Sequence, residues 1–268
     1  MSVYGDTIIL GDGSLIGSAQ FSNKLTNPNF SINQRVVAGT VVLAAGAYGH
    51  DRWKAGAGGC TYTFATVANV TILTISAGTL QQIIEGANLQ SATHYLSWTG
   101  TATGRVDSGS YGATGLSATA VGGTNQTIEF TTGTLSLPRY NQSAISSIQF
   151  LPIGLELFIC QRYLPAFSIG NGFFAGMGQC TSTTAVSIVL PLPVTARVPP
   201  TNITVTGTGS VTSAAGGPIG LNTITFSAGT TNSLTIAGSS GGGLVAGNAT
   251  IFYSNSAPLI ILPTGCEL

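Results

Sequence analysis

The sequence predicts an all-β protein: a jelly-roll β-sandwich, a short connecting helix and a second, smaller C-terminal β-sandwich. Apolar and polar residues alternate in short segments that recur roughly every 8 to 15 residues, with Gly, Asn or Ser between them. Only Ile153 to Tyr163 has the apolar spacing of a helix. This rhythm is typical of sandwiches and not of alternating strands and helices. The expected segments are an attachment arm at 1–25, the jelly roll at 26–152, a helical connector at 153–166 and the second sandwich at 167–268.

Charged residues are unusually rare. They make up 6 % of the 268 residues, eight basic and eight acidic, against an average near ~25 %. Without a net charge the chain does not attract phosphates or anionic lipids, so neither nucleic acid nor a membrane surface is an expected partner. The best membrane candidate, Val36 to Tyr48, is interrupted by glycines and is shorter than the ~20 residues of a spanning helix. So few charges protect weakly against self-association, which favours an oligomer or a larger assembly.

The N-terminal segment is predicted to form a small hairpin. Asp6 to Leu10 has the pattern of a short strand, and a turn signal follows at Gly11-Asp12-Gly13. The further carboxylates of a calcium loop are missing, so no metal site is expected here. An arm too small for its own core is suited to docking on a partner.

The first sandwich is marked by strict alternation. In Cys60 to Phe64 every second residue is apolar, which places the two threonines on the opposite face. Val70 to Ile75 repeats the pattern, and His94 to Thr99 places Leu96 and Trp98 on one side, so Trp98 is expected in the core. The next stretch, Gly104 to Thr124, is rich in Gly, Ser and Ala and suggests exposed loops, followed by a strand at 126–131.

Two interpretations of the connecting helix remain open. Leu155, Phe158 and Ile159 are spaced to form one apolar face, and Pro165 closes the stretch. The apolar face either plugs the base of the jelly roll, or the helix carries a subunit contact near a symmetry axis. The candidate contact residues are Phe158, Arg162 and Tyr163. Arg162 is expected to bond Glu156 or backbone carbonyls.

The second half repeats the β pattern. Ser187 to Leu192 is predicted to be an edge strand because Pro191 cannot donate a hydrogen bond to a neighbouring strand. Further strands are expected at 202–205, 223–227, 233–237, 250–254 and 259–262. About 100 residues of this kind predict a small sandwich. The cysteines are widely scattered, which indicates buried thiols rather than a disulfide framework or a zinc site.

Four stretches carry a resemblance to a known family: NPNFSINQR from Asn27, YGHDRWKAG from Tyr48, TLQQIIEGANLQSATHYLSWTGTATGRV from Thr79 and LPIGLELFICQRYL from Leu151. In this order and spacing, over roughly residues 27 to 164, they resemble a family of β-sandwich proteins of tailed bacteriophages and prophages. Its members are tail fibre, receptor-binding or virion appendage proteins. The family often has a longer loop where Tyr140 to Ile148 is compact here, which leaves any function of that loop open.

The resemblance implies a structural, non-enzymatic virion protein, made in the bacterial host cytoplasm and then built into the particle. It implies a homotrimer that contacts other virion proteins through its N-terminal arm and adsorbs to host-surface glycans. No cofactor is expected. A head or collar fibre that decorates the capsid is the alternative from the same class.

Several residues are candidates for glycan binding. Tyr48, Arg52 and Trp53 combine aromatic rings, which stack on a pyranose, with a cation that bonds its hydroxyls. The alternative is structural: Trp53 fills the core, and Asp51 pairs with Arg52 or Arg35. If sugars bind, Tyr95, Tyr111 or the Gly-rich loops are the expected contacts, because loops and exposed aromatics carry recognition.

An enzyme is the alternative from another class. The chain has two histidines, neither of them near a GxSxG context, so no catalytic residue is assigned. Hydrolysis of a glycan needs two converging carboxylates. The candidates Asp51, Glu85, Asp107 and Glu129 are spread through the predicted jelly roll. A glycan-degrading enzyme would lose activity on replacement of Glu85, Asp107 or Glu129.

Overall fold

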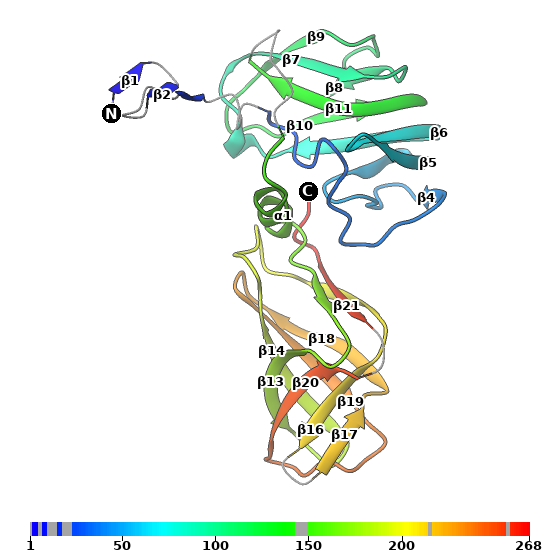
Figure 1. Ribbon diagram of the computed structural model, residues 1–268, viewed down its shortest axis with the longest axis vertical. Coiled ribbons are helices and arrows are strands. Elements are labelled where there is room, and N and C mark those ends of the chain that lie inside the picture. The colour runs from blue at the N-terminus through cyan, green and yellow to red at the C-terminus, as the bar shows by residue number, and fades with distance from the viewer. Residues whose placement is uncertain are drawn as a thin grey trace. The chain divides into compact units, whose positions relative to one another are not determined.

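The structure, a computed structural model, describes residues 23–142, 150–213, 216–255 and 258–268, together with the backbone of three short strands nearer the N-terminus (Figure 1). It is all-β, with antiparallel sheets and a half-barrel. The chain divides into two compact units, Met1–Leu157 and Phe158–Leu268, each with its own hydrophobic core. The division falls within the segment expected to be the helical connector.

The N-terminal strands β1 (Ser2–Tyr4), β2 (Thr7–Ile9) and β3 (Leu15–Gly17) form a small antiparallel sheet. β2 and β3 pair with each other, as a hairpin requires. The predicted turn, Gly11 to Gly13, lies outside the described residues.

The first unit is built on an eight-stranded sheet. Its strands are β4 (Val41–Leu43), β5 (Lys54–Val67), β6 (Val70–Ile84), β7 (Ala92–Thr99), β8 (Gly104–Val106), β9 (Leu116–Ala120), β10 (Gln126–Phe130) and β11 (Gly133–Asn141). They neighbour one another in the order β4-β5-β6-β11-β7-β9, while β10 pairs with β6 and β8.

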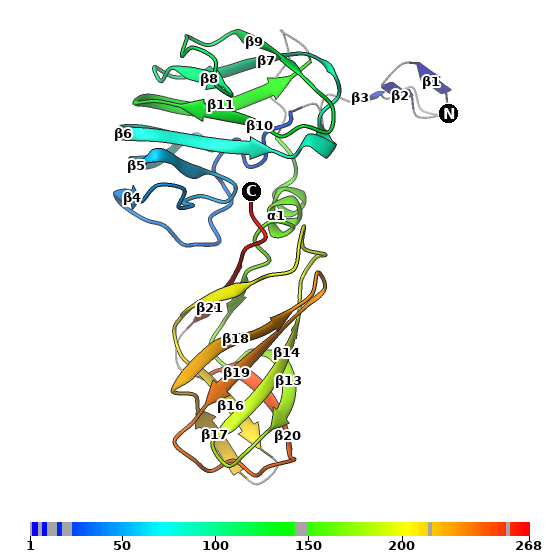
Figure 2. The ribbon, with the colours of Figure 1, turned by 180° about the vertical axis from the view of Figure 1, so that it is seen from behind.

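The long strand β6 changes partners along its length. Leu73–Ile75 pairs with β11, and Leu80–Ile84 pairs with β10. Gly78 lies between the two halves with a φ of 70°, and a Cβ there would collide with the backbone of Gly59. Only glycine fits this position. The sheet therefore splits into two branches, β10 with β8 and β11 with β7 and β9 (Figure 2).

One core lies between the branches, and the predicted alternation is confirmed there. Tyr62 on β5 and Leu96 on β7 are fully buried, and Trp98 is 5 % exposed. Trp98 packs edge-on against Phe130 of β10, with ring centres 5.1 Å apart. The indole N–H of Trp98 donates to the Ala102 carbonyl at 3.0 Å, which satisfies its polar atom in the core.

Two segments of the first unit differ from the predictions. The stretch expected to be loops, Gly104 to Thr124, contains β8 and β9. β9 pairs with β7 although its residues are small, because pairing depends on the neighbouring strand as well as on local propensity. β11 was not among the expected strands, and it contains Pro138, which cannot donate a hydrogen bond to a neighbouring strand. The register shifts between Ser136 and Arg139, so Pro138 sits in an irregularity of the ladder.

The predicted helix is confirmed as α1 (Ile153–Gln161). Its first turn begins with the carbonyl of Pro152, which accepts the N–H of Leu155 at 2.9 Å. No helix in the part of the chain that the structure describes is long and apolar enough to cross a membrane.

The buried face of α1 differs from the expected apolar plug. Phe158 is 58 % exposed, whereas Glu156 and Cys160 are buried. The carboxylate of Glu156 accepts the backbone N–H of Asn27 at 2.5 Å. A polar contact within the first unit therefore fixes the start of the helix, because a buried carboxylate needs a donor.

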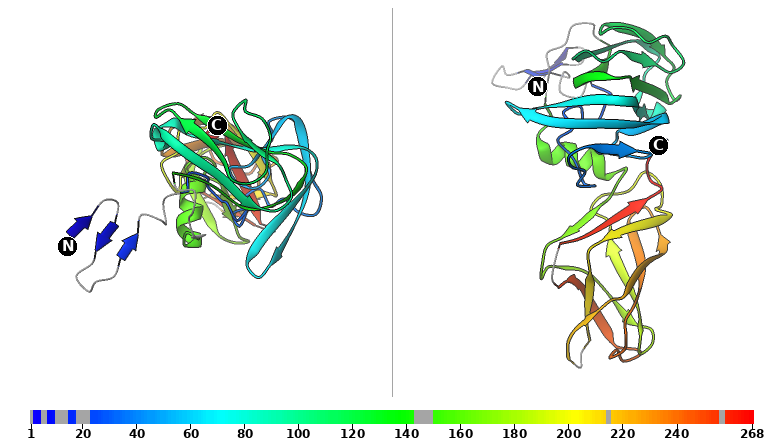
Figure 3. Two further views of the ribbon diagram at one scale, coloured as in Figure 1. Left: turned by 90° about the horizontal axis from the view of Figure 1, so that it is seen from above. Right: turned by 90° about the vertical axis from the view of Figure 1, so that its right-hand side faces the viewer.

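The second unit contains two antiparallel sheets (Figure 3). The smaller sheet has the order β12 (Phe167–Ile169), β21 (Leu259–Thr264), β15 (Asn202–Thr206). The larger has the order β17 (Gly216–Gly220), β16 (Gly209–Ser213), β20 (Ala249–Ser254), β13 (Phe174–Cys180), β14 (Ala185–Pro191), β19 (Ser233–Ser239), β18 (Thr223–Gly229). Side chains of both sheets share one core, with Ile169 and Ile261 from the smaller sheet and Ile188 and Phe252 from the larger.

The edge position predicted for the strand around Ser187 to Leu192 is wrong. β14 lies inside the larger sheet, between β13 and β19. Pro191 is tolerated because it is the last residue of β14, and pairing with β13 has already ended at Val189.

All four cysteines, Cys60, Cys160, Cys180 and Cys266, are buried and carry free thiols. This agrees with the expectation of buried thiols. Burial raises the pKa of Cys60 and of Cys266 to about 11.

Candidate ligand-binding face of the first unit

Four strands place one polar residue each in a line across the sheet. Lys54 on β5 lies opposite Gln81 on β6, Gln81 lies opposite Glu129 on β10, and Glu129 lies opposite Arg105 on β8. Residues opposite one another in antiparallel strands point to the same side of the sheet. Their neighbours along the strands face the core: Ala55, Leu80, Val106, Ile128 and Phe130.

A tyrosine closes the line at each end. Tyr48 forms an isolated bridge with Lys54, whose ammonium nitrogen lies 5.8 Å from the ring centre. At the other end the bridge between Gly104 and Gly112 brings Tyr111 beside Arg105, whose guanidinium carbon is 4.4 Å from the ring centre. Cations at these distances are attracted to the ring face. We call Tyr48, Lys54, Gln81, Glu129, Arg105 and Tyr111 the polar row.

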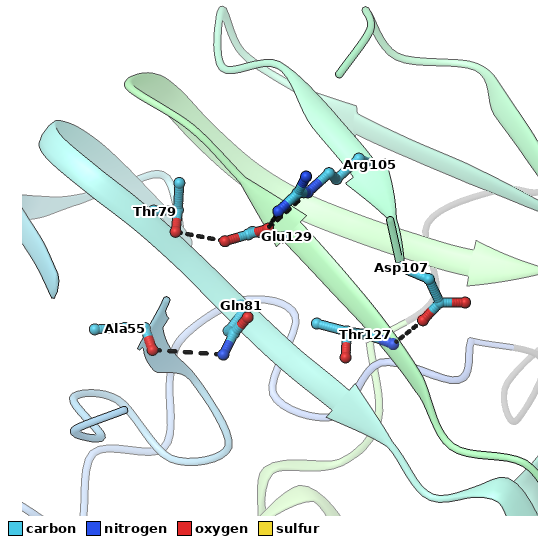
Figure 4. Close-up of polar contacts among 7 residues, drawn as sticks. All are labelled: Ala55, Thr79, Gln81, Arg105, Asp107, Thr127 and Glu129. Atoms are coloured by element: carbon cyan, nitrogen blue, oxygen red, sulfur yellow. Dashed lines mark hydrogen bonds and ion pairs between the residues drawn. The ribbon is translucent and has the colours of Figure 1, made fainter. Parts of the chain in front are cut away.

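Glu129 organises one half of the polar row. It accepts the Nε–H of Arg105 at 2.7 Å, and the Nη2 of the same guanidinium lies 2.5 Å from its Oε2. Its other oxygen accepts the hydroxyl of Thr79 at 2.5 Å. Figure 4 shows Glu129 between these two partners. The Glu129 side chain is 8 % exposed and that of Arg105 is 32 % exposed, so Arg105 is the group presented to solvent.

The charges of this half are fixed at neutral pH. Burial alone would raise the pKa of the Glu129 carboxyl, but hydrogen bonds from Thr79, Arg105 and Tyr111 and the charge of Arg105 bring it below its usual value. Burial, followed by the contact with Glu129, raises the pKa of Tyr111 to about 12. The row therefore offers an ionised pair and a neutral phenol.

At Gly56 the backbone of β5 lies close to the side chains of Glu129 and Thr79. A Cβ at Gly56 would lie 2.6 Å from Oε1 of Glu129 and would collide with the Thr79 hydroxyl. The absence of a side chain lets the backbone shield the carboxylate, which explains why Glu129 is so little exposed.

The structure supports the structural role of the Asp51-Arg52-Trp53 motif. All three residues are at most 3 % exposed, so the Trp53 ring is not available to stack on a sugar. Asp51 accepts hydrogen bonds from the backbone and the side chain of Gln34 at 2.7 and 2.6 Å. Arg52 donates to the Ile83 carbonyl at 2.6 Å.

Asn27 fastens the motif to the chain that precedes it. Its carbonyl accepts the indole N–H of Trp53 at 3.0 Å, and its side chain donates to the carbonyls of Ile32 and Asp51 at 2.8 and 3.1 Å. The first two stretches that carry the family resemblance therefore hold each other in place, which is a folding role.

The remaining aromatic candidates separate in space. Tyr48 and Tyr111 both belong to the polar row, and Tyr111 is 37 % exposed. Tyr95 is half-buried on β7, in the other branch of the sheet, where it lies opposite Ser117 and Asn141. The structure does not bring Tyr95 to the polar row.

No family model and no curated protein matches this chain. The local geometry of the described residues therefore carries the functional argument.

The predicted contact residues of the helical segment have different exposures. Phe158 is exposed, Arg162 is half-buried and Tyr163 is 3 % exposed. The guanidinium carbon of Arg162 lies 5.3 Å from the centre of the Tyr163 ring, and the Arg162 carbonyl accepts the backbone N–H of Arg197 at 2.7 Å.

The second unit exposes an apolar stripe that the sequence analysis missed. Met177 on β13 lies opposite Val189 on β14 and opposite Ile251 on β20. These side chains are 72 %, 48 % and 38 % exposed. Phe174, three residues before Met177 on β13, is 67 % exposed. We call Phe174, Met177, Val189 and Ile251 the apolar stripe. Contiguous exposed apolar groups of this kind indicate an interaction surface.

A concavity of about 600 Å³ also lies in the first unit. Its lining includes Phe64, Asn33 and His50. His50 bonds the hydroxyl of Tyr62 through Nδ1 at 2.9 Å, and burial lowers its pKa to about 4. His50 is therefore a neutral residue of the concavity wall, and its Nδ1 is already hydrogen-bonded to Tyr62.

The carboxylate candidates for hydrolysis are only partly brought together. Asp107 lies just beyond the end of β8, the strand next to that of Glu129, and accepts the backbone N–H of Thr127 on β10 at 2.8 Å (Figure 4). Glu85 lies beyond the end of β6. In the described ranges, 23–142, 150–213, 216–255 and 258–268, no cluster of His, Cys, Asp and Glu is suited to hold a metal ion.

Sequence reasoning did not find Lys54, Gln81 or Arg105. They are separated by up to about 50 positions, and only the register of four strands aligns them. The one signal of this site in the sequence was the pair Tyr48 and Tyr111. Both were candidates because aromatic rings stack on sugars, and their positions at the ends of one row were not predicted.

Proposed function

We propose that this protein is a structural appendage of a tailed-bacteriophage virion, of the tail-fibre or receptor-binding type, that adsorbs to host-surface glycans. The polar row carries the proposal. It lines up partly exposed hydrogen-bonding side chains between two tyrosines on a sheet. Aromatic rings cover the apolar face of a pyranose, while planar polar groups bond its hydroxyls.

The assembly is part of the same proposal. The first unit is a jelly-roll sandwich, α1 is the connector and the second unit is a smaller sandwich. The segment 1–25 attaches the chain to other virion proteins. The half-barrel around one core and the core shared by two sheets support this interpretation, as does the resemblance of the stretches around Asn27 and Tyr48.

The protein forms a homotrimer in this proposal. The apolar stripe supports self-association because three neighbouring strands expose apolar side chains in register. With only 6 % charged residues, little electrostatic repulsion opposes the association.

The protein acts without catalysis in this proposal. Glycan hydrolysis requires a carboxylic acid that keeps its proton near neutral pH, and therefore a raised pKa. Glu129 has the opposite shift. A reducing-sugar assay on host polysaccharide is expected to stay flat, and a measurable rate that is lost in Asp107→Asn would establish the hydrolase instead.

Binding to immobilised host polysaccharide tests the proposal directly. Gln81→Ala and Arg105→Ala are expected to weaken binding about tenfold each, which corresponds to about 1.4 kcal/mol. The matched control is Tyr95→Ala, which alters a half-buried aromatic on the other branch of the sheet. Wild-type protein that binds no host glycan would overturn the proposal.

Gold-labelled antibody on intact particles tests the position on the virion. Gold at the tail tip or baseplate is expected for an adsorption protein. Gold over the head or collar would favour the decoration fibre, and adsorption would then lose its support.

A further inference from the structure

The polar row has a length and a direction. It crosses six backbone segments, from Tyr48 through β5, β6, β10 and β8 to Tyr111. Five inter-strand spacings of about 4.8 Å give roughly 24 Å along the sheet. This is much longer than one sugar ring, so a monosaccharide would occupy only a small part of it.

The two ends of the row are held in place by neighbouring side chains. The Tyr111 ring is fixed against Arg105, which is itself held by Glu129. Two cationic groups lie over the Tyr48 ring: the Lys54 ammonium nitrogen is 5.8 Å from the ring centre, and the Arg35 guanidinium carbon is 5.1 Å from it. Side chains that are already ordered lose little conformational freedom on binding, so both ends can contribute to affinity.

The middle of the row offers directional groups. Gln81 is half-buried, and its amide nitrogen lies 3.5 Å from the Ala55 carbonyl. Arg105 presents a planar guanidinium that is 32 % exposed. Glu129 positions Arg105 here, because its carboxylate oxygens accept hydrogen bonds from Arg105 and Thr79. Amide and guanidinium groups suit sugar hydroxyls.

From this geometry we infer that the ligand is an unbranched oligosaccharide that lies across the strands, with one ring at Tyr48, another at Tyr111 and the intervening rings over Gln81 and Arg105. This inference rests on the proposed function and assigns its ligand class. A linear chain laid along the row can contact its members one after another.

Binding measured against chain length tests the inference. The probes are size-fractionated linear oligosaccharides, from the disaccharide upward, prepared from host surface polysaccharide and titrated calorimetrically. Affinity is expected to rise with length until the chain covers both tyrosines, at roughly five rings for a row of about 24 Å, and then to level off.

Two variants locate the ends of the ligand. Tyr48→Ala and Tyr111→Ala are each expected to weaken binding of the longest oligosaccharide about tenfold, and the double variant is expected to remove the dependence on length. Tyr95→Ala is the control and leaves the length profile unchanged. Thermal unfolding of each variant confirms that it remains folded.

The outcomes separate this inference from the function on which it rests. An affinity that is already maximal for the disaccharide, or a length profile that one tyrosine replacement leaves intact, overturns the extended site and leaves glycan adsorption standing. If oligosaccharides of every length and the intact polysaccharide fail to bind, both are overturned.

Discussion

Glu129 and His50 are two buried ionisable residues that respond to acid for opposite reasons. Glu129 is held in its charged form by Arg105 and Thr79. His50 is held in its neutral form by burial and bonds Tyr62. Both preferences are stability contributions that depend on pH.

The first prediction concerns His50. Its pKa is about 4 in the folded chain, against about 6.5 when unfolded, so the unfolded state takes up the proton first as the pH falls. The free energy of unfolding is expected to drop by about 3 kcal/mol between pH 6.5 and 4 because of this group. Urea unfolding at a series of pH values measures the slope.

His50→Gln is the informative variant for this prediction. The glutamine amide can donate or accept a hydrogen bond with the Tyr62 hydroxyl and does not titrate. The variant is expected to lose most of the dependence between pH 6.5 and 4. An unchanged slope would show that another group is responsible.

The second prediction concerns Glu129. Its lowered pKa means that its stabilisation is complete above about pH 4.3 and is lost as the pH falls through the folded-state value. Glu129→Gln is expected to cost about 1 to 2 kcal/mol at pH 7. The difference from wild type should be smaller at pH 3 than at pH 7, because acid shifts the wild-type carboxyl toward its protonated form. Equal costs at both pH values would argue against an ionic role.

Residue-scale predictions from the sequence succeeded where alternation decided them. Leu96 and Trp98 are buried because they occupy one face of a strand. The partners of Glu129 could not be predicted, because Thr79 and Arg105 are 50 and 24 positions away in the sequence. Local pattern carries no information about such pairs.

At the scale of elements, the position of α1 could be predicted from the sequence, but the face that it buries could not. Its position and type follow from helix formers that lie between prolines. Of the two interpretations of its apolar face, the plug does not match the structure: Phe158 is exposed, while Glu156 is buried and bonds Asn27, 129 positions away. β11 was not among the expected strands either, and its Pro138 is compatible with a strand only where the ladder is irregular.

The third prediction tests this helix contact. Burial raises the pKa of the Glu156 carboxyl, and the hydrogen bond from Asn27 opposes that shift. Glu156→Gln keeps an acceptor and removes a buried charge, so unfolding stability should be unchanged or increased. Glu156→Ala leaves the Asn27 N–H without this acceptor and should cost about 1 to 3 kcal/mol.

Chemical denaturation of the two Glu156 variants decides this point. The contrast between glutamine and alanine separates the hydrogen bond from the charge. Equal stability of both variants would mean that the contact contributes little.

At the scale of the whole molecule, self-association stays a prediction. A chain with 6 % charged residues predicted interaction with copies of itself, and the apolar stripe is a surface suited to that role. The sequence could not place the stripe, because Met177, Val189 and Ile251 become neighbours only through strand register.

The fourth prediction tests self-association. Met177→Glu introduces a charge in the middle of the apolar stripe and is expected to shift a trimer toward monomers in sedimentation velocity. The control is Val42→Glu, since Val42 is equally exposed, at 73 %, in the first unit. If Met177→Glu sediments like wild type, the stripe is not the contact surface.

The four buried thiols can be used to detect local unfolding of each unit separately. A thiol with a pKa near 11, such as that of Cys60 or Cys266, is almost entirely protonated at neutral pH and reacts slowly even where reagent can reach it. Reaction with a disulfide reagent therefore marks the moments at which the surrounding core comes apart. Since Cys60 belongs to the first unit and Cys180 and Cys266 to the second, one labelling time course followed by peptide mapping would reveal which half of the molecule loosens first.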